Sequence, residues 1–331
     1  MSDYKKHIEA AMTTCLTETN LGLGTKYRGK VRDTYDLGNE LLLVTTDRQS
    51  AFDRVLAAVP FKGQVLNLIS AWWFEKTANI IPNHLLRLPH PNLMLAKKCT
   101  VFPIEFVVRA YITGSTKTSL WTQYQQGVRN YCGHHFPEGL RKNQKLPHAL
   151  LTPSTKEELS DRPISADEIL SLKLLTEEEW ELTSKAALQL FEFGTNVAKQ
   201  QGLILVDTKY EMGRDSEGRI VLVDELHTPD SSRYWLSDRY QHQFDNGEEP
   251  INIDKEFLRL WFIDHCNPYQ DKILPKAPNA LIITLASRYI ELYERITGHA
   301  FDFPEKNASV LEQIERCAHL IIDKDNHSCA E

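Results

Sequence analysis

Apolar and polar residues follow strand patterns in the first third of the chain, with one helical interval. The expected strands are Thr34–Asp36, Leu41–Val44, Val55–Pro60, Leu93–Lys97 and Phe102–Ala110. Between them, residues 64–78 repeat apolar positions at helical spacing. The pattern predicts a small β-rich N-terminal lobe over residues 1–110.

The remainder of the chain alternates between irregular and periodic segments. Residues 130–165 are rich in Pro, Lys and polar side chains, which favours a long loop that lines or closes a site. A capping box, Thr176 with Glu179, predicts the start of a helix, and residues 203–227 read as a β-hairpin. We expect a larger lobe over 111–250 and, over 251–331, helices that pack on the lobes and carry no chemistry.

Composition narrows the class of protein. The 331 residues carry 38 basic and 45 acidic side chains, a formal charge of −7 that argues against a basic nucleic-acid-binding surface. No apolar stretch is long enough for a membrane span, and no signal peptide is recognisable. Six cysteines without CxxC spacing indicate reduced thiols. We expect a cytoplasmic protein without a membrane or nucleic-acid partner.

A glycine-containing basic segment, Gly24–Asp33, is the first candidate for chemistry. Gly24 to Lys30 fits GxxxxGK, but Val31 stands where a Walker loop needs Ser or Thr, and a strand follows instead of a helix. A P-loop NTPase is therefore excluded. What remains is a loop with four cations and one carboxylate whose backbone amides could approach an anion. A solvated basic turn is the alternative.

The hairpin at 203–227 carries charges inside apolar strands. Asp207, Lys209 and Glu211 alternate onto one face, and in an odd register Asp224 would stand opposite Lys209 or Glu211. Such carboxylates suit Mg²⁺ shared with nucleotide phosphates. The alternative is a half-exposed hairpin with its polar face in water, but the apolar runs on both strands make unpaired charges costly there.

Polar clusters on turns complete the candidates. They are Ser50–Asp53, Arg109–Ser115, Thr152–Lys156 and Pro229–Trp235. Each offers Arg, Lys, Ser or Thr donors that suit carboxylate and phosphate oxygens, although any single one could be a turn with a local hydrogen bond.

Together these segments resemble the phosphoribosylaminoimidazole-succinocarboxamide synthase (SAICAR synthetase) family. The matching text is YRGKVRDTYD (27–36), DRQSAFD (47–53), FPIEFVVRAYITGS (102–115), TPSTK (152–156), GLILVDTKYEMG (202–213) and VDELHTPDSSRYW (223–235). The resemblance covers residues 25 to 240 and rests on several separated motifs that agree in order.

The resemblance implies an α+β, ATP-grasp-like fold whose two lobes enclose ATP. It also implies a ligase that uses ATP and Mg²⁺ to join L-aspartate to the carboxylate of the imidazole ribonucleotide CAIR, giving SAICAR, ADP and phosphate. The expected route passes through an acyl phosphate, because a carboxylate is a poor electrophile. The partners are then small molecules, and the chain is a monomer or homodimer.

The resemblance also implies roles for individual residues. For ATP they are Gly29, Lys30, Val31 and Arg32 at the phosphates, Lys98 near the nucleotide and Glu105 in a hinge at the adenine. For Mg²⁺ they are Glu211 and Asp224. For CAIR they are Lys209 near the reacting carboxylate, then Arg109, Ser115, Ser232 and Arg233, with Ser50 and Asp53 at the ribose or imidazole. Lys156 and Asp161 belong to a loop that reaches the phosphoryl group, and catalysis is assigned to Lys209, Lys156 and Arg233.

Two other functions are compatible with parts of this pattern. A small-molecule kinase on a related fold would use Lys30, Glu211 and Asp224 for MgATP but would leave a stable phosphorylated product. A catalytically inactive nucleotide-binding module would have no reason to keep Lys209, Glu211 and Asp224 in an apolar hairpin.

Overall fold

The computed structural model describes residues 2–156, 161–304 and 308–328. The chain forms two compact units, each assembled from segments distant in sequence. Unit 1 comprises Met1–Trp72, Leu85–Lys98 and Phe262–Glu331, and unit 2 comprises Trp73–His84 and Cys99–Trp261. The boundaries of these units differ from residues 110 and 250, where the sequence pattern predicted them. The division into 1–110, 111–250 and 251–331 stays a prediction.

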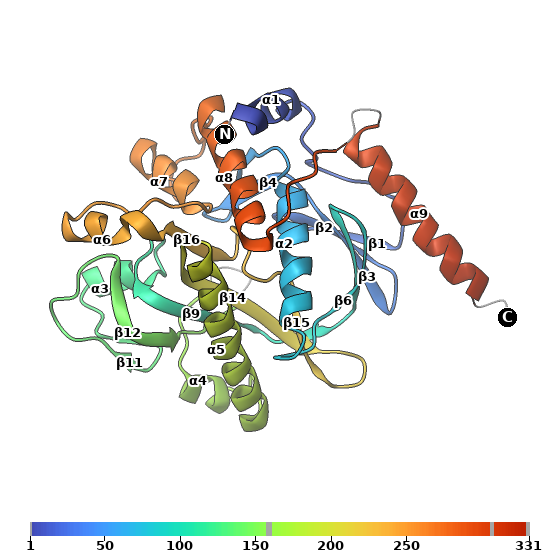
Figure 1. Cartoon of the computed structure of the whole chain (residues 1–331). Coiled ribbons are helices and arrows are strands. Elements are labelled where there is room, and N and C mark those ends of the chain that lie inside the picture. The colour runs from blue at the N-terminus through green and yellow to red at the C-terminus, as the bar shows by residue number, and fades with distance from the viewer. Residues whose placement is uncertain (1, 157–160, 305–307, 329–331) are drawn as a thin grey trace. The chain divides into compact units, whose positions relative to one another are not determined.

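Helices and strands are mixed throughout, which confirms the α+β class. Figure 1 labels the elements. The helices are α1 (Ser2–Ala11), α2 (Lys62–Lys76), α3 (Leu120–Gln125), α4 (Ala166–Ser171), α5 (Glu177–Gln200), α6 (Ser237–Asp245), α7 (Glu256–His265), α8 (Asn279–Thr297) and α9 (Val310–Ser328).

Unit 1 contains an antiparallel sheet in the order β1-β2-β3-β7-β6. Its strands are β1 (Thr25–Arg28), β2 (Arg32–Asp36), β3 (Glu40–Thr45), β6 (Leu85–His90) and β7 (Leu93–Lys97). A separate hairpin joins β4 (Arg48–Ala51) to β5 (Arg54–Ala58). The strand expectations in this region are confirmed.

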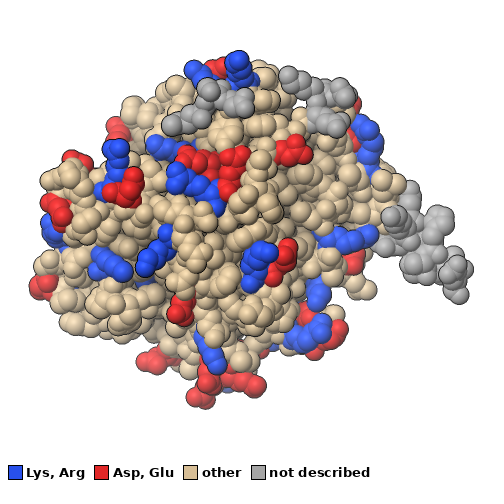
Figure 2. All heavy atoms as spheres, viewed as in Figure 1, with Lys and Arg blue, Asp and Glu red and all other residues tan. Residues whose placement is uncertain are grey.

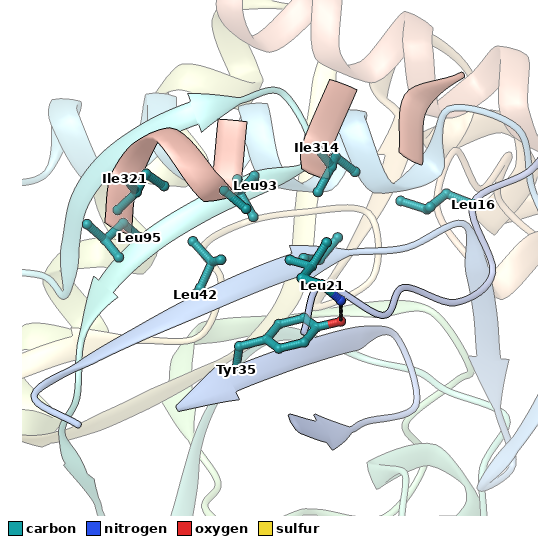
Figure 3. Close-up of a cluster of buried hydrophobic side chains, with 10 residues drawn as sticks. Leu16, Leu21, Tyr35, Leu42, Leu93, Leu95, Ile314 and Ile321 are labelled. Atoms are coloured by element: carbon teal, nitrogen blue, oxygen red, sulfur yellow. Dashed lines mark hydrogen bonds between the residues drawn. The ribbon is translucent and has the colours of Figure 1, made fainter. Parts of the chain in front are cut away.

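One face of this sheet packs against the last helix. Alternate residues of β3 and β7, including Leu42 and Leu95, contact Ile314 and Ile321 of α9 (Figure 3). The Tyr35 hydroxyl accepts a hydrogen bond from the Leu21 amide at 3.2 Å. The apolar spacing of α9 therefore has the packing role that the sequence predicted.

Unit 2 contains a larger sheet, whose path β12-β9-β14-β15 is extended by β13 on β9 and by β8 and β16 on β14. The strands are β8 (Thr100–Val101), β9 (Ile104–Ile112), β12 (Gln144–Leu151), β13 (Ser154–Thr155), β14 (Leu203–Arg214), β15 (Ile220–Val223) and β16 (Ser232–Leu236). Because β14 has strands on both sides, its apolar residues are buried, and its charged residues need specific partners.

Helix α5 covers β9 and β14 and begins at the predicted capping box (Figure 1). The Thr176 hydroxyl accepts from the Glu179 amide at 3.2 Å, and the Glu179 carboxylate accepts from the Thr176 amide at 2.9 Å. Its buried stripe includes Ala187, Leu190 and Phe191. Residues 203–227 form the expected hairpin of β14 and β15.

The prediction of a long loop over residues 130–165 is wrong in part. This segment contains β12 and β13 and a short hairpin of β10 (Asn130–Tyr131) and β11 (His134–His135). β12 is an edge strand in which Leu146 is the one buried residue, and its register shifts between Lys145 and Leu150. Pro147 is tolerated at such an edge, and together with Lys145 it hides the alternation that would identify a strand. Residues 157–160 lie outside the described ranges.

Candidate active site

A lysine surrounded by carboxylates lies at the centre of the unit 2 sheet. Lys209 projects from β14, and its Nζ lies 2.7 Å from Glu211 Oε1 and 2.9 Å from Glu105 Oε1 of β9. Asp224, just after β15, places Oδ2 at 3.8 Å. Three carboxylates therefore converge on one lysine, as predicted, but the third is Glu105 and not Asp207.

The route by which Asp224 reaches this cluster differs from the expectation. β14 and β15 pair Glu211 with Val223 and Arg214 with Ile220, so the odd register is wrong. The ladder ends at Val223, and Asp224 has a left-handed backbone with φ 67°. Its side chain is consequently aimed by this local conformation and not by strand alternation.

The cluster keeps Lys209 protonated. Burial favours the neutral amine and would lower the pKa of Lys209, but Glu211, Glu105 and Asp224 outweigh burial and raise the pKa well above its ordinary value. Burial would likewise raise the pKa of Glu105, yet the charge of Lys209 lowers it. Lys209 is therefore a fixed positive charge at neutral pH and is unsuited to act as a base.

The segment 152–161 adds a second lysine. Lys156 Nζ forms an ion pair with Glu211 Oε2, and its backbone amide donates to Pro103 O at 3.0 Å. Glu211 therefore bridges Lys156 and Lys209 through its two oxygens. Asp161 lines the pocket described next. The structure brings Lys156 of the TPSTK segment to Glu211 of the hairpin.

Next to the lysine cluster, two arginines share a buried aspartate. Asp207 Oδ2 accepts from Arg233 Nη1 at 2.6 Å and from Arg109 Nη1 at 3.0 Å. Burial would lower the pKa of Arg233, but Asp207 and Glu256 raise it. Removing one partner of such a buried pair costs about 3–5 kcal/mol, so these charges hold one another in place.

Glu256, at the start of α7, accepts hydrogen bonds from two residues that the resemblance assigns to CAIR, Arg233 and Ser115. Its Oε2 lies 3.3 Å from Arg233 Nη2, and its Oε1 accepts from the Ser115 hydroxyl. Burial would raise the pKa of Glu256, but Arg233 and Arg259 lower it to about 2. Ser115 consequently contacts Glu256 and is absent from the pocket lining, whereas Ser232 lines the pocket and donates to Thr208 Oγ1 at 2.7 Å.

These side chains line one cavity, which we call the unit 2 pocket. The expected residues on its wall are Glu105, Arg109, Asp161, Lys209, Ser232 and Arg233, and the wall also carries Asp207, Asp230, Asp254, Lys255 and Arg259. Asp254, Lys255 and Arg259 come from residues 251–331, which were expected to form packing helices without chemistry. The pattern that could have identified them is the run Asp254-Lys255-Glu256 at a helix start, with Arg259 one helical turn later.

In unit 1, the expected phosphate loop is the tip of the β1–β2 hairpin. The strand β2 after Lys30 agrees with the exclusion of a Walker loop. Three backbone carbonyls at the tip accept hydrogen bonds from other segments of unit 1. Gly29 O and Lys30 O accept from the Arg48 guanidinium at 3.0 and 3.3 Å. Val31 O accepts from the Thr46 amide at 3.0 Å. Within the described chain the amides of Lys30 and Val31 have no hydrogen-bond partner, which leaves them available to an anion.

The cations of this loop are balanced by neighbouring acids. Lys30 Nζ lies 2.5 Å from Asp53 Oδ1, and Lys26 Nζ lies 3.5 Å from Glu18 and from Asp33. Lys98 pairs with Asp36 at 2.7 Å. The cationic character read from residues 24–33 alone is thus reduced by partners from other segments. The Lys30 side chain stays largely exposed beside the open amides.

The β4–β5 turn presents Asp53 to Lys30 in a strained conformation. Phe52 and Asp53 have φ of 54° and 58°, without a glycine to relieve them. Such backbone costs on the order of 1–3 kcal/mol per residue and is frequent at functional positions. Ser50 lies in β4 just before this turn and is buried. The unit 1 motifs therefore meet around one hairpin tip.

Arg48 is a residue that sequence reasoning missed. It is buried, its Nη2 donates to Asp33 Oδ1 at 2.7 Å, and its Nη1 donates to Thr17 O at 2.6 Å. It thereby ties the phosphate loop carbonyls to a buried carboxylate. A lysine cannot reproduce this fork of donors.

For the ligase that the resemblance implies, Arg48→Lys is expected to raise the KM for ATP about tenfold while changing the KM for CAIR less than threefold, because the loop amides lose their fixed orientation. Steady-state kinetics with each substrate varied in turn provide the measurement. Arg87→Lys, an exposed position on β6, is the control. Equal increases in both KM values would show that Arg48 supports unit 1 as a whole and does not position the loop.

On the face shown in Figure 2, basic and acidic side chains are interspersed, without a continuous basic area. In the described ranges, no helix combines the length and apolarity required to cross a bilayer.

Comparisons with known proteins decide the family. The sequence model described as SAICAR synthetase matches residues 25–276. The chain belongs to the SAICAR synthetase family. A phosphoribosylaminoimidazole-succinocarboxamide synthase of Legionella pneumophila (strain Paris) is 66% identical over 309 residues, which cover 92% of this chain and 99% of that protein. The chloroplastic enzyme of Arabidopsis thaliana is 57% identical over 314 residues, 93% of this chain and 76% of that protein.

A solved structure supports the same assignment. The SAICAR synthase from Saccharomyces cerevisiae complexed with SAICAR matches with a TM-score of 0.74 and 32% identity, over 87% of this chain and 100% of that chain. The family catalyses ATP-dependent ligation of aspartate to CAIR in purine biosynthesis. The resemblance predicted from the motifs is therefore confirmed, and the chain is a ligase.

Proposed function

We propose that ligation proceeds at the Lys209 cluster through an acyl phosphate of CAIR. A CAIR carboxylate oxygen attacks the γ-phosphorus of ATP, the bond to the β-phosphate oxygen breaks, and ADP leaves. The uncharged amine of L-aspartate then attacks the acyl carbon, and phosphate leaves with the bridging oxygen as the nitrogen loses a proton. The observation that supports this proposal is a permanently charged lysine, held by three carboxylates, on the wall of the unit 2 pocket.

Lys209 is assigned to the reacting carboxylate because its charge can offset the negative charge that develops there. Fixed donors of this kind need no reorganisation during the reaction, and removing one typically lowers kcat by about 10²–10³. Lys156, paired to the other oxygen of Glu211, is assigned to the transferred phosphoryl group. Neither lysine takes up a proton in this scheme.

CAIR binding is assigned to the arginine side of the same pocket. Arg109 and Arg233 are oriented by Asp207, and planar guanidinium groups match the geometry of phosphate and carboxylate oxygens. Ser115 and Ser232 are assigned beside them, and Asp161, which lines the pocket, is assigned to the side of the transferred phosphoryl group. Ser50 and Asp53 of unit 1 keep their expected roles at the ribose or imidazole.

The acids of the cluster fit a magnesium ion. Glu211 and Asp224 offer hard oxygen ligands, and Mg²⁺ is usually held by one or two carboxylates together with substrate phosphates. In the part of the chain that the structure describes, no three such side chains are grouped to hold a metal ion by themselves. When bound, Mg²⁺ would neutralise phosphate charge.

For ATP, we assign the phosphates to Gly29, Lys30, Val31 and Arg32 through the open amides of Lys30 and Val31. Lys98 is assigned to the nucleotide, and the hinge around Glu105 to the adenine. Because the Glu105 carboxylate points to Lys209, its backbone is the better candidate for that contact. The cytoplasmic location and the choice between monomer and homodimer stay predictions.

A substrate-omission assay tests the proposed reaction. ADP release by the purified protein should require CAIR, L-aspartate and Mg²⁺ together, and phosphate should appear in equal amount. If CAIR is labelled with ¹⁸O in its carboxylate, one ¹⁸O should be transferred to phosphate. Release of unlabelled phosphate during SAICAR formation would refute the acyl phosphate, and a stable phosphorylated product would indicate a kinase.

A further inference from the structure

Two basic residues on the wall of the unit 2 pocket, Lys255 and Arg259, can each accept a further hydrogen-bond or ion-pair partner. Arg259 pairs with Glu256 Oε2 through Nη1 at 3.2 Å, but its Nε is buried without a hydrogen-bond partner. Lys255 lines the pocket, and its Nζ forms no ion pair within 4.0 Å among the described residues. A buried donor without a partner costs about 1–3 kcal/mol, so a ligand that supplies an acceptor would recover this loss.

The other cations of the pocket are already committed. Asp207 holds Arg109 and Arg233, and Glu105 and Glu211 hold Lys209. Lys255 is different: burial and the nearby charge of Arg259 lower its pKa to about 8, and the acids Asp230 and Glu225 only partly oppose this. An additional anion beside Lys255 and Arg259 would therefore be stabilised by both.

We infer that Lys255 and Arg259 form the subsite for the carboxylates of L-aspartate. This inference rests on the proposed function, in which the aspartate amine must come within bonding distance of the activated carboxylate beside Lys209. Lys255 and Lys209 line the same pocket, so an anion held by Lys255 lies in the cavity that contains the reacting centre. The two carboxylates of the substrate match two cations one helical turn apart at the start of α7.

The alternative occupant is the CAIR phosphate, which is assigned to Arg109, Ser115 and Arg233. Arg233 and Arg259 pair with the same oxygen of Glu256, Oε2, at 3.3 and 3.2 Å, so the two sets of cations adjoin within one pocket. The KM values for L-aspartate and CAIR distinguish the two occupants.

Lys255→Met and Arg259→Gln are each expected to raise the KM for L-aspartate at least tenfold, with KM values for CAIR and ATP within threefold of the parent chain. Succinate, a dicarboxylate without the amine, should compete with L-aspartate, and its inhibition constant should rise in parallel. Lys185→Met, at an exposed site of α5, is the matched control. Arg259→Lys keeps the charge but removes Nε, and a rise of about fivefold is expected.

The outcomes separate this inference from the proposed reaction. A raised KM for CAIR with an unchanged KM for L-aspartate would place the two cations in the CAIR subsite and overturn the inference. Unchanged constants for all substrates would also overturn it. If circular dichroism shows that Lys255→Met or Arg259→Gln is unfolded, the inhibition constant of succinate is measured on the folded Arg259→Lys variant. An unchanged inhibition constant in that variant would overturn the inference. Failure of the parent chain to form SAICAR would instead refute the proposed function.

Discussion

Lys209→Met is expected to lower kcat at least about 1,000-fold, which corresponds to about 4 kcal/mol of transition-state stabilisation. The substitution removes the fixed charge beside the reacting carboxylate and leaves Glu105, Glu211 and Asp224 without their shared partner. Single-turnover ADP formation in the presence of CAIR measures the step in which that charge acts.

Lys199→Met, an exposed lysine at the end of α5, provides the control for this experiment. Lys209→Arg should recover part of the lost rate because it restores the charge, although its planar group cannot reproduce all three contacts. Turnover of the methionine variant within tenfold of the parent chain would remove Lys209 from the reacting centre.

Glu211→Gln is expected to reduce turnover by at least about 100-fold while leaving the dissociation constant of CAIR within threefold. The amide is a weaker ligand for Mg²⁺, and it leaves Lys156 and Lys209 without the carboxylate that links them. Kinetics over a range of Mg²⁺ concentrations, together with calorimetric titration of CAIR, measure both effects.

Glu217→Gln is the matched control, because Glu217 lies at the exposed turn of the same hairpin, where it forms an ion pair with Arg219. We expect its turnover and Mg²⁺ requirement to equal those of the parent chain. If Glu211→Gln shows the same insensitivity, the hairpin acids neither bind the metal nor position the lysines.

Much of the local structure could be predicted because it depends on neighbouring residues. The capping box marked the start of α5, and charged residues within apolar runs identified the β14–β15 hairpin. The prediction of a long loop was wrong because an edge strand buries few side chains, so β12 lacks a clear alternation of buried and exposed residues. The predicted register of β14 and β15 was wrong because strand periodicity does not describe Asp224, whose backbone leaves the strand conformation.

The site residues divide in the same way. Lys209, Glu211 and Asp224 stood out because a charge in an apolar strand needs a partner or a ligand. Arg48 and Lys255 did not stand out, because a buried arginine or a lysine at a helix start has the same sequence pattern as an exposed one. Their contacts come from segments far away in the chain: Arg48 meets Gly29, and Lys255 shares a pocket with Arg109.

The family, the α+β class and the charged motifs could be recognised from residue identity and short spacing alone. The position of Glu105 in place of Asp207 beside Lys209, the pairing of Asp207 with two arginines and the contribution of α7 to the pocket became known only from the folded chain. An ion pair forms where long-range strand pairing brings opposite charges together, and a one-dimensional pattern does not contain that pairing.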